Sequence, residues 1–445
     1  MRNKISVAPW VTGLLAAGAV LAASVPAAAQ DAGTPACSSF TNPVYISGSS
    51  ASKPVLQALA TTLIADGVPV SIIYTSPDSC LGVQDMLEGQ PSTESGVTPV
   101  YLGSAGATTN CTTTASEGVD IAVSDVFPAT CATNAGLTIP STVVEVQGPI
   151  QAMTMVVPGG TSGSSAASIS AKAAYVVFGN DAATYTVAPW SVSSNIFVRA
   201  QTSGTLNMIG AAIGLVPSKW VNASTTGTPP AQQAGSTGTM ETDVANVTSN
   251  VANTIGILSA EGVAGFNAKS PAVPLKILAF QANDQSCGYL PDSSTTAFDK
   301  INVRQGRYAI WGPLHFLAPT SGGQPTGPDA AAVATVLNYF LATGKNPSAT
   351  PFTGALTGDA GVSTADVQAL ITAEAKPGYV VPWCAMEAQR SLEVGPESSY
   401  SSPEPCSCLF ETTLGATVSG HTCTACSTSS PCSTGVCRYG FCEVQ

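Results

Sequence analysis

Short apolar runs alternate along this chain with small polar turns and with segments of helical periodicity. Apolar runs at 44–46, 70–74 and 119–123 are typical of buried strands. The segments 54–60 and 83–87, which follow the first two runs, have the pattern of helices, and the first opens on a proline, which helices tolerate at their start. This repetition of strand, turn and helix predicts an α/β fold with parallel strands.

The rest of the chain continues the alternation. The pattern predicts further strands at 151–158, 195–199, 254–258 and 275–280, and further helices at 168–178, 206–215, 242–251, 330–341 and 364–374. An apolar segment spans 309–317, the polar stretch 222–238 indicates a surface loop, and the Pro/Ser-rich stretch 393–405 indicates a linker before a cysteine-rich tail at 406–445. At 445 residues the chain is too long for one ordinary core, so two domains or lobes are expected.

The N-terminus has the three parts of a secretory signal peptide. A positive stretch at 1–4 precedes an apolar run at about 11–25, and small residues follow up to Ala29. We therefore expect residues 1–29 to be removed on export. The alternatives are a membrane anchor, for which the apolar run is short, and a lipid anchor at Cys37, whose preceding residues match a lipobox poorly. No other segment is apolar over about 18 residues, so no integral membrane segment is expected after cleavage, and the predicted location is periplasmic or extracellular.

Charge is scarce in this chain. Asp, Glu, Lys and Arg make up 9% of the residues, and the net charge is −12. A nucleic-acid partner needs a basic face on the protein, so the composition excludes nucleic acid as a ligand. An acidic chain also repels anions at long range, and any anion site must therefore be built locally.

The 13 cysteines fall into two sets. One set is spread over the main body and the other crowds the tail: Cys37, Cys80, Cys111, Cys131, Cys287 and Cys384, then Cys406, Cys408, Cys423, Cys426, Cys432, Cys437 and Cys442. In an exported protein they indicate disulfides, and zinc in the tail is the alternative. The odd count leaves one thiol free or paired with another chain, and the sequence does not determine the connectivity.

Three strand-to-helix turns consist largely of glycine and small hydroxyl residues. They span 48–53, 76–82 and 203–205. A helix N-terminus offers unpaired backbone N–H groups and a partial positive charge, and hydroxyls beside it can donate to a tetrahedral anion. Ser and Thr are also good helix caps, and for any one of these turns capping is a sufficient explanation.

Two charged residues favour an oxyanion site. Arg199 ends an apolar strand four residues before Ser203, and a guanidinium beside helix N–H groups suits bidentate oxyanion binding. Asp125 follows Ser124 at a strand end, where open α/β folds bind ligands. An ionised carboxylate only accepts hydrogen bonds, so it favours phosphate, which carries a proton, over sulfate, which carries none. The alternatives are a surface or salt-bridge role for Arg199 and a capping role for Asp125.

The same residues resemble those of a known family. The run 46–54, Ile-Ser-Gly-Ser-Ser-Ala-Ser-Lys-Pro, is similar to the first ligand loop of the periplasmic phosphate-binding protein of the phosphate ABC transporter. The run 120–125, which ends in Ser-Asp, resembles a strand end of that family. The run 199–205, Arg-Ala-Gln-Thr-Ser-Gly-Thr, matches its Arg-x-x-x-Ser-Gly-Thr motif with the spacing intact, and 254–258 is similar to its Gly-containing strand. The resemblance covers about 44–316.

The resemblance implies a two-lobed type II periplasmic binding protein that closes around phosphate and acts with an ABC transporter permease. Lobe I would combine 37–147 with 275–392, and lobe II would span 148–274. The implied phosphate ligands are Ser52, Lys53, Ser79, Asp125, Arg199, Ser203, Gly204 and Thr205. This chain departs from the family in three places: Lys53 stands where the family commonly has an aromatic residue, Cys80 and Leu81 stand where it tends to have Ser and Gly, and the cysteine tail has no counterpart in the simple transport form.

An enzyme, in the form of a secreted phosphatase, is the main alternative. The chain has two histidines: His315 lies in an apolar segment typical of a core, and His421 lies in the cysteine tail. A Ser-His-Asp arrangement and a histidine-rich metal site therefore have few candidates, and we expect binding without catalysis, metal or cofactor. A surface interaction or adhesion protein on the same fold is a third class, which the disulfide-rich tail favours.

Overall fold

The computed structural model describes residues 33–91, 97–161, 163–180, 186–224, 228–356, 362–376, 380–415, 422–433 and 435–443. The expected signal peptide and His421 lie outside these residues. Residues Thr34–Gln445 form one compact unit, and the description below concerns this unit. Among the described helices, none has both the length and the apolar character needed to span a membrane.

The first strands form the predicted parallel sheet. Strand β1 (Pro43–Gly48) pairs in parallel with β2 (Ser71–Thr75) on one side and with β5 (Ile121–Ser124) on the other. Helix α1 (Lys53–Ala65) follows β1 and α2 (Ser79–Glu88) follows β2, as the sequence predicts. A short antiparallel hairpin, β3 (Val100–Leu102) and β4 (Thr108–Asn110), extends the sheet beyond β2.

Two long antiparallel strands make the sheet mixed rather than parallel throughout. Strand β6 (Val143–Pro158) pairs along its first half with β13 (Trp311–Ser321), which in turn pairs with β5. Near its end, β6 pairs with β10 (Gly256–Ser259) and β11 (Leu275–Ile277). The sequence predicted only the second half of β6, because its first half mixes polar with apolar residues and lacks a continuous buried run.

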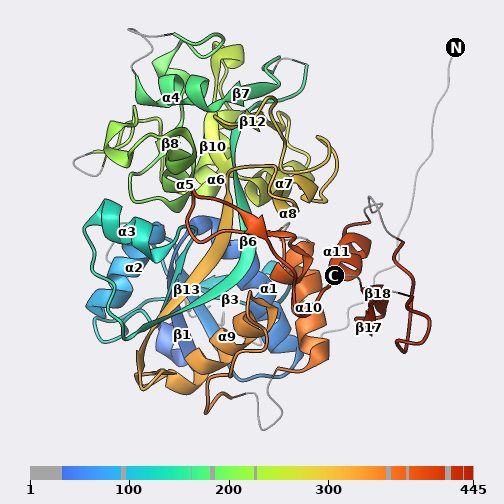
Figure 1. Cartoon of the computed structure of the whole chain (residues 1–445). Coiled ribbons are helices and arrows are strands. Elements are labelled where there is room, and N and C mark those ends of the chain that lie inside the picture. The colour runs from blue at the N-terminus through green and yellow to red at the C-terminus, as the bar shows by residue number, and fades with distance from the viewer. Residues whose placement is uncertain are drawn as a thin grey trace, which may run out of the picture. The chain divides into compact units, whose positions relative to one another are not determined.

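Strand β6 therefore connects two parts of the unit (Figure 1). We call them the β1 half and the β10 half. Besides β1–β5, the β1 half holds α1, α2, α3 (Pro128–Ala135), α9 (Ala330–Thr343) and α10 (Thr364–Ala375). Besides β10 and β11, the β10 half holds β7 (Ser168–Ser170), α4 (Ala171–Gly179), β8 (Val198–Arg199), α5 (Gly204–Ile213), β9 (Gln233–Ala234), α6 (Thr237–Ala245), α7 (Ala260–Ala268) and β12 (Ala279–Gln281). The expected two-part α/β architecture is confirmed, and the exact lobe boundaries stay a prediction.

Helix packing follows the apolar spacing of the sequence. Val55, Leu56, Leu59 and Leu63 of α1 are fully buried, at the spacing that places residues on one face of a helix. They pack in one apolar cluster with the buried residues of β1, β2 and α9. These buried residues therefore determine which side of α1 faces the sheet.

One helix begins earlier than expected. Helix α6 was predicted at 242–251, but it spans Thr237–Ala245, and its first residues come from the stretch expected to be a surface loop. The Ser236 hydroxyl accepts a hydrogen bond from the Thr239 backbone N–H at 3.1 Å, which caps the helix. The capping residues decided the start, and the apolar spacing alone did not show it.

The cysteine sets are joined rather than separate. Cys384 of the main body pairs with Cys406 of the tail, and further disulfides are Cys37–Cys111, Cys80–Cys131, Cys408–Cys423, Cys426–Cys437 and Cys432–Cys442. All tail cysteines are paired, which leaves no thiolate for zinc. Cys287 is the free thiol, and it is exposed. The predicted linker 393–405 lies within the loop that Cys384–Cys406 closes, and that loop contains the strand pair β15 (Ala388–Gln389) and β16 (Ser398–Ser399).

The tail itself is small. It contains α11 (Ser407–Leu414) and the hairpin of β17 (Val436–Arg438) with β18 (Phe441–Glu443). The Glu443 carboxylate accepts hydrogen bonds from the backbone N–H groups of Cys408 and Leu409 at 2.8 and 2.9 Å. A carboxylate at these first-turn N–H groups satisfies donors that the helix leaves unpaired. The hairpin thus caps the helix.

Candidate functional site

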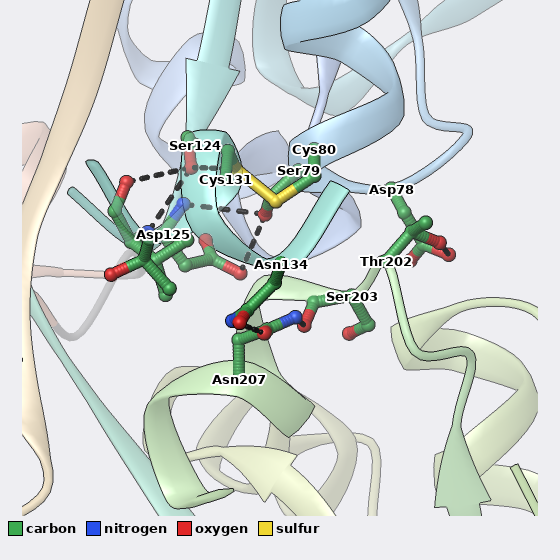
Figure 2. The surroundings of a disulfide bond; sticks show 12 residues. Asp78, Ser79, Cys80, Ser124, Asp125, Cys131, Asn134, Thr202, Ser203 and Asn207 are labelled. Carbon is green, nitrogen blue, oxygen red and sulfur yellow. Dashed lines mark hydrogen bonds between the residues drawn. A yellow bond between two sulfur atoms is a disulfide. The ribbon is translucent and has the colours of Figure 1, made fainter. Parts of the chain in front are cut away.

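The candidate site lies where α5 of the β10 half meets strand ends of the β1 half (Figure 2). The approach is close at Gly204, the first residue of α5. A Cβ atom on Gly204 would lie 2.3 Å from Ser79 Oγ and 2.8 Å from both Cβ and Oδ2 of Asp125. Only a glycine fits this position in the closed arrangement, since real Cβ contacts are longer.

Asp125 is the central acid of this site. It is 2% exposed, and Ser79 Oγ lies 3.4 Å from its Oδ2 and 3.3 Å from its backbone N–H. Burial raises its pKa to about 6, against the opposing effects of the Ser49 hydroxyl and the Arg199 charge. Its other carboxylate oxygen, Oδ1, is buried and has no hydrogen-bond partner among the described residues. At neutral pH the site therefore holds an ionised carboxylate, and one of its oxygens, Oδ1, has no hydrogen-bond donor within the described parts of the chain.

Arg199 supplies the positive charge, and it is 3% exposed. Its Nη2 donates to Asp78 Oδ1 at 2.7 Å, and its Nη1 donates to Ser50 Oγ at 3.3 Å. Its Nε donates to the Ala234 carbonyl at 3.0 Å, which fixes the plane of the guanidinium. The arginine thus reaches from β8 across to two turns of the β1 half.

A disulfide holds two of the site turns together. Cys80, beside Ser79 at the start of α2, pairs with Cys131 of α3, the helix that follows Asp125 (Figure 2). The Ser124 hydroxyl hydrogen-bonds both the N–H and the carbonyl of Val126, at 3.1 and 2.8 Å. These covalent and local contacts place Ser79 against Asp125.

Further hydrogen bonds connect the two halves around Arg199. Ser50 Oγ lies 2.9 Å from Thr237 Oγ1 and accepts the Thr237 backbone N–H at 3.1 Å. Asn134 of α3 donates to Asn207 of α5 at 2.5 Å. The Thr202 carbonyl accepts from the Cys80 backbone N–H at 3.2 Å. The described structure is therefore a closed arrangement of the two halves.

The other predicted ligands all lie at helix starts, and all but Lys53 are buried. Ser52 is fully buried and donates to the Ser49 carbonyl at 2.7 Å, within its own turn. Ser203 and Thr205 are both 2% exposed, and Ser203 makes no side-chain cap to α5, which leaves the first N–H groups of this helix without the usual cap. Lys53 is exposed at the start of α1, and the structure shows no contact that brings it to Asp125 or Arg199.

Three site residues were missed from the sequence. Asp78 precedes Ser79 at the start of α2, where an acid is an ordinary cap, and Thr237 lies in the stretch expected to be a loop. The Ser-Thr-Gly run at 236–238 resembles the other hydroxyl–glycine turns, and this similarity could have indicated Thr237 as a site residue. Gln151 of β6 donates to the Ala51 carbonyl at 3.0 Å, while its Oε1 is buried without a partner among the described residues. A lone glutamine within an apolar strand was the available signal.

His315 is a buried core residue, as predicted, although it neighbours the site. It lies on β13 opposite Ser124 of β5 and is 0% exposed. Its Nδ1 lies 2.7 Å from Glu145 Oε1, and its Nε2 has no hydrogen-bond partner among the described residues. Its ring also packs against Phe127 at 4.4 Å between centroids. A Ser-His-Asp arrangement requires a hydrogen bond between the histidine and a serine hydroxyl, and His315 makes none to the described residues.

Comparison with known proteins gives similarities of structure only. No protein-family model and no curated protein matches the chain. The chain is similar in structure to a protein from Clostridium perfringens that is described as a phosphate ABC transporter substrate-binding protein with bound phosphate. The two share 14% sequence identity, the match covers 76% of this chain and 99% of that chain, and the TM-score is 0.45. It is also similar to an ABC-type phosphate transport receptor from Vibrio cholerae (14% identity, 66% and 93% covered, TM-score 0.39) and to the OxyR regulatory domain from Pseudomonas aeruginosa (8% identity, 63% and 90% covered, TM-score 0.33).

Proposed function

We propose that this protein is an exported solute-binding protein that captures a tetrahedral oxyanion, inorganic phosphate in the first place, and passes it to the permease of an ABC importer without chemical change. One observation carries the proposal: Asp125 Oδ1 is buried beside the uncapped start of α5, and no described residue donates a hydrogen bond to it. The helix N-terminus and Arg199 favour an anion, and the carboxylate demands a proton from it. Phosphate meets both conditions at neutral pH.

Selection against sulfate follows from the same carboxylate. Sulfate has no proton to donate, so it would place an oxygen lone pair against Asp125, and both groups would stay unsatisfied. A buried site gains most of its discrimination in this way, because an unpaired polar group there costs about 1–3 kcal/mol. The importer and its permease come from the resemblance of the three ligand motifs. The periplasmic or extracellular location comes from the signal-peptide pattern at 1–29, and the disulfides fit an oxidising compartment.

A thermal-shift panel with phosphate, sulfate, molybdate and phosphonates tests this function. A ligand that binds only the native state at about 100 times its Kd stabilises by about 2.7 kcal/mol, so phosphate should raise Tm by a few degrees. Arg199→Ala should abolish the shift, while Arg307→Ala, at an exposed arginine, should keep it. If phosphate at 1 mM leaves Tm unchanged with the disulfides intact, the transport role is wrong and a surface interaction role becomes the better explanation.

The role of Asp125 has its own test. Asp125→Asn supplies an amide that can donate to an unprotonated oxygen, so the variant should bind sulfate better relative to phosphate. Asp284→Asn, at an exposed aspartate, should leave the phosphate-to-sulfate ratio as it is. Unchanged selectivity in Asp125→Asn would remove this residue from the site. Release of phosphate from a chromogenic ester by the native protein would favour a phosphatase.

A further inference from the structure

Side chains hold the turn that carries Asp125. The Asp125 backbone N–H donates to Ser79 Oγ at 3.3 Å, and the N–H of the following residue donates to Ser124 Oγ at 3.1 Å (Figure 2). The third N–H, that of Phe127, donates to Oε1 of Glu393. Three successive N–H groups after β5 are thus bound by side chains, so the loss of one of these side chains leaves part of the turn without its hydrogen bond.

Glu393 comes from a part of the chain far from the ligand motifs. It lies 266 positions after Phe127, in the loop between β15 and β16, and we call this loop, residues 390–397, the strap. Its Oε2 accepts the Thr130 hydroxyl at 2.6 Å. One carboxylate therefore binds both the first turn of α3 and the residue before the helix, and it fixes them relative to Asp125.

The strap reverses the usual pattern of exposure. Leu392 and Val394, on either side of Glu393, are 48% and 53% exposed, whereas Glu393 is 4% exposed. A surface loop ordinarily leaves its charged residues in water and turns its apolar residues inward. Burial of the acid costs free energy that its hydrogen bonds must offset. Positions that break the local pattern in this way are where function is expected.

A buried arginine holds the strap in place. Arg390 donates through Nη1 to the Glu393 carbonyl at 2.7 Å. Its guanidinium carbon lies 4.0 Å from the centre of the Trp311 ring on β13, and its Nη2 donates to Glu397, which also accepts Trp311 Nε1 at 3.1 Å. The strap also lies within the loop that the disulfide between body and tail closes. Glu393 thus extends from a support that is fastened to β13, the strand between β5 and β6.

We propose, on the basis of the function proposed above, that Glu393 is a positioning residue for oxyanion binding, and that the strap holds Asp125 in place for the ligand. Glu393 acts through the Phe127 N–H and the Thr130 hydroxyl. Without it, the turn samples orientations in which the Asp125 carboxylate no longer meets the anion, and Kd rises as the competent orientation becomes rarer. The cysteine-rich tail then contributes to binding, because its disulfide to the body closes the loop from which Glu393 extends.

The test is the Kd for inorganic phosphate, measured by calorimetry on the full disulfide-bonded protein. Glu393→Ala leaves the Phe127 N–H without its acceptor, and Kd should rise about tenfold. Glu393→Gln keeps an amide oxygen as the acceptor, so its Kd should stay within about threefold of the native value. Leu392→Ala, at an exposed neighbour in the strap, should keep the native Kd.

A double-mutant cycle with Asp125 separates positioning from a general loss of structure. Asp125→Ala removes the group that the strap positions, so in that background Glu393→Ala should change Kd by less than about twofold. Hydrogen exchange of the Phe127 backbone N–H should be faster in Glu393→Ala than in the native protein and in Leu392→Ala. Circular dichroism and Tm establish that each variant is folded. Thr130→Val, which removes one of the two contacts, should raise Kd about threefold and decides the matter even if Glu393→Ala does not fold.

The inference is wrong if folded Glu393→Ala, or Thr130→Val in its place, binds phosphate with the native Kd, and the phosphate-binding function then stands. It is also wrong if Glu393→Ala weakens binding equally with and without the Asp125 carboxylate, because Glu393 is then a general support of the fold. Absence of phosphate binding by the native protein rejects the proposed function, and the inference with it.

Discussion

Gly204→Ala is the substitution that tests the closed geometry most directly. The added Cβ would meet Ser79 Oγ at 2.3 Å and Asp125 Cβ at 2.8 Å. The first neighbour is a hydroxyl that can rotate away, but the second is anchored to its own backbone. Atoms in contact normally lie about 3.5–4.0 Å apart, so α5 would have to retreat by roughly 1 Å or leave the β1 half.

The size of the effect follows from the cost of overpacking. Forcing an extra methyl group into a close-packed contact costs about 1–3 kcal/mol. That cost applies only when the halves are closed, so the affinity for phosphate should fall about 5- to 140-fold, since about 1.4 kcal/mol corresponds to a factor of ten. Alanine also favours a helix over glycine by up to about 1 kcal/mol, so an open, unliganded form should lose no stability.

Calorimetry with phosphate and small-angle scattering of the unliganded protein would measure both consequences. The matched control is Gly238→Ala, also in the first turn of a helix, where an added Cβ meets nothing within 4 Å. We expect a larger radius of gyration and weaker binding for Gly204→Ala, and native values for Gly238→Ala. Native affinity in Gly204→Ala would refute the placement of α5 against Asp125.

Three further predictions concern stability and the thiols. Burial raises the pKa of Glu374 to about 8, and both its carboxylate oxygens lack partners among the described residues, so the protonated form stabilises the native state. This contribution to stability is full below the ordinary pKa of 4.5 and is lost as the pH rises to 8, at up to about 1.4 kcal/mol per pH unit. Glu374→Gln should therefore flatten the dependence of Tm on pH across that range. Replacing Cys384 and Cys406 together by Ser should destabilise by about 3 kcal/mol in denaturant unfolding, because it opens a loop of 22 residues, and an unchanged midpoint would contradict the pairing. A thiol reagent should label one site per native chain, and Cys287→Ser should abolish the labelling without changing Tm.

Much of the candidate site could be predicted because its parts are local. Ser79, Asp125 and Gly204 each belong to a short run that ends a strand or begins a helix, and such runs reflect the capping and turn chemistry of nearby residues. The structure places these three residues against one another. Lys53 lies in such a run, but its side chain is exposed. The sequence could not predict this exposure, because it places a residue at a helix start without determining which way the side chain points.

The sequence by itself determined the strand-and-helix alternation of the β1 half, the hydroxyl–glycine turns and the presence of disulfides, since backbone propensity, apolar period and cysteine chemistry act over a few residues. Only the tertiary structure decided which partners meet. Asp78 and Arg199 lie 121 positions apart, and Cys384 pairs across the expected boundary between body and tail. Their contacts depend on how β6 and β13 join the two halves, and no local pattern encodes that geometry. The charge balance around Arg199 is therefore a property of the fold.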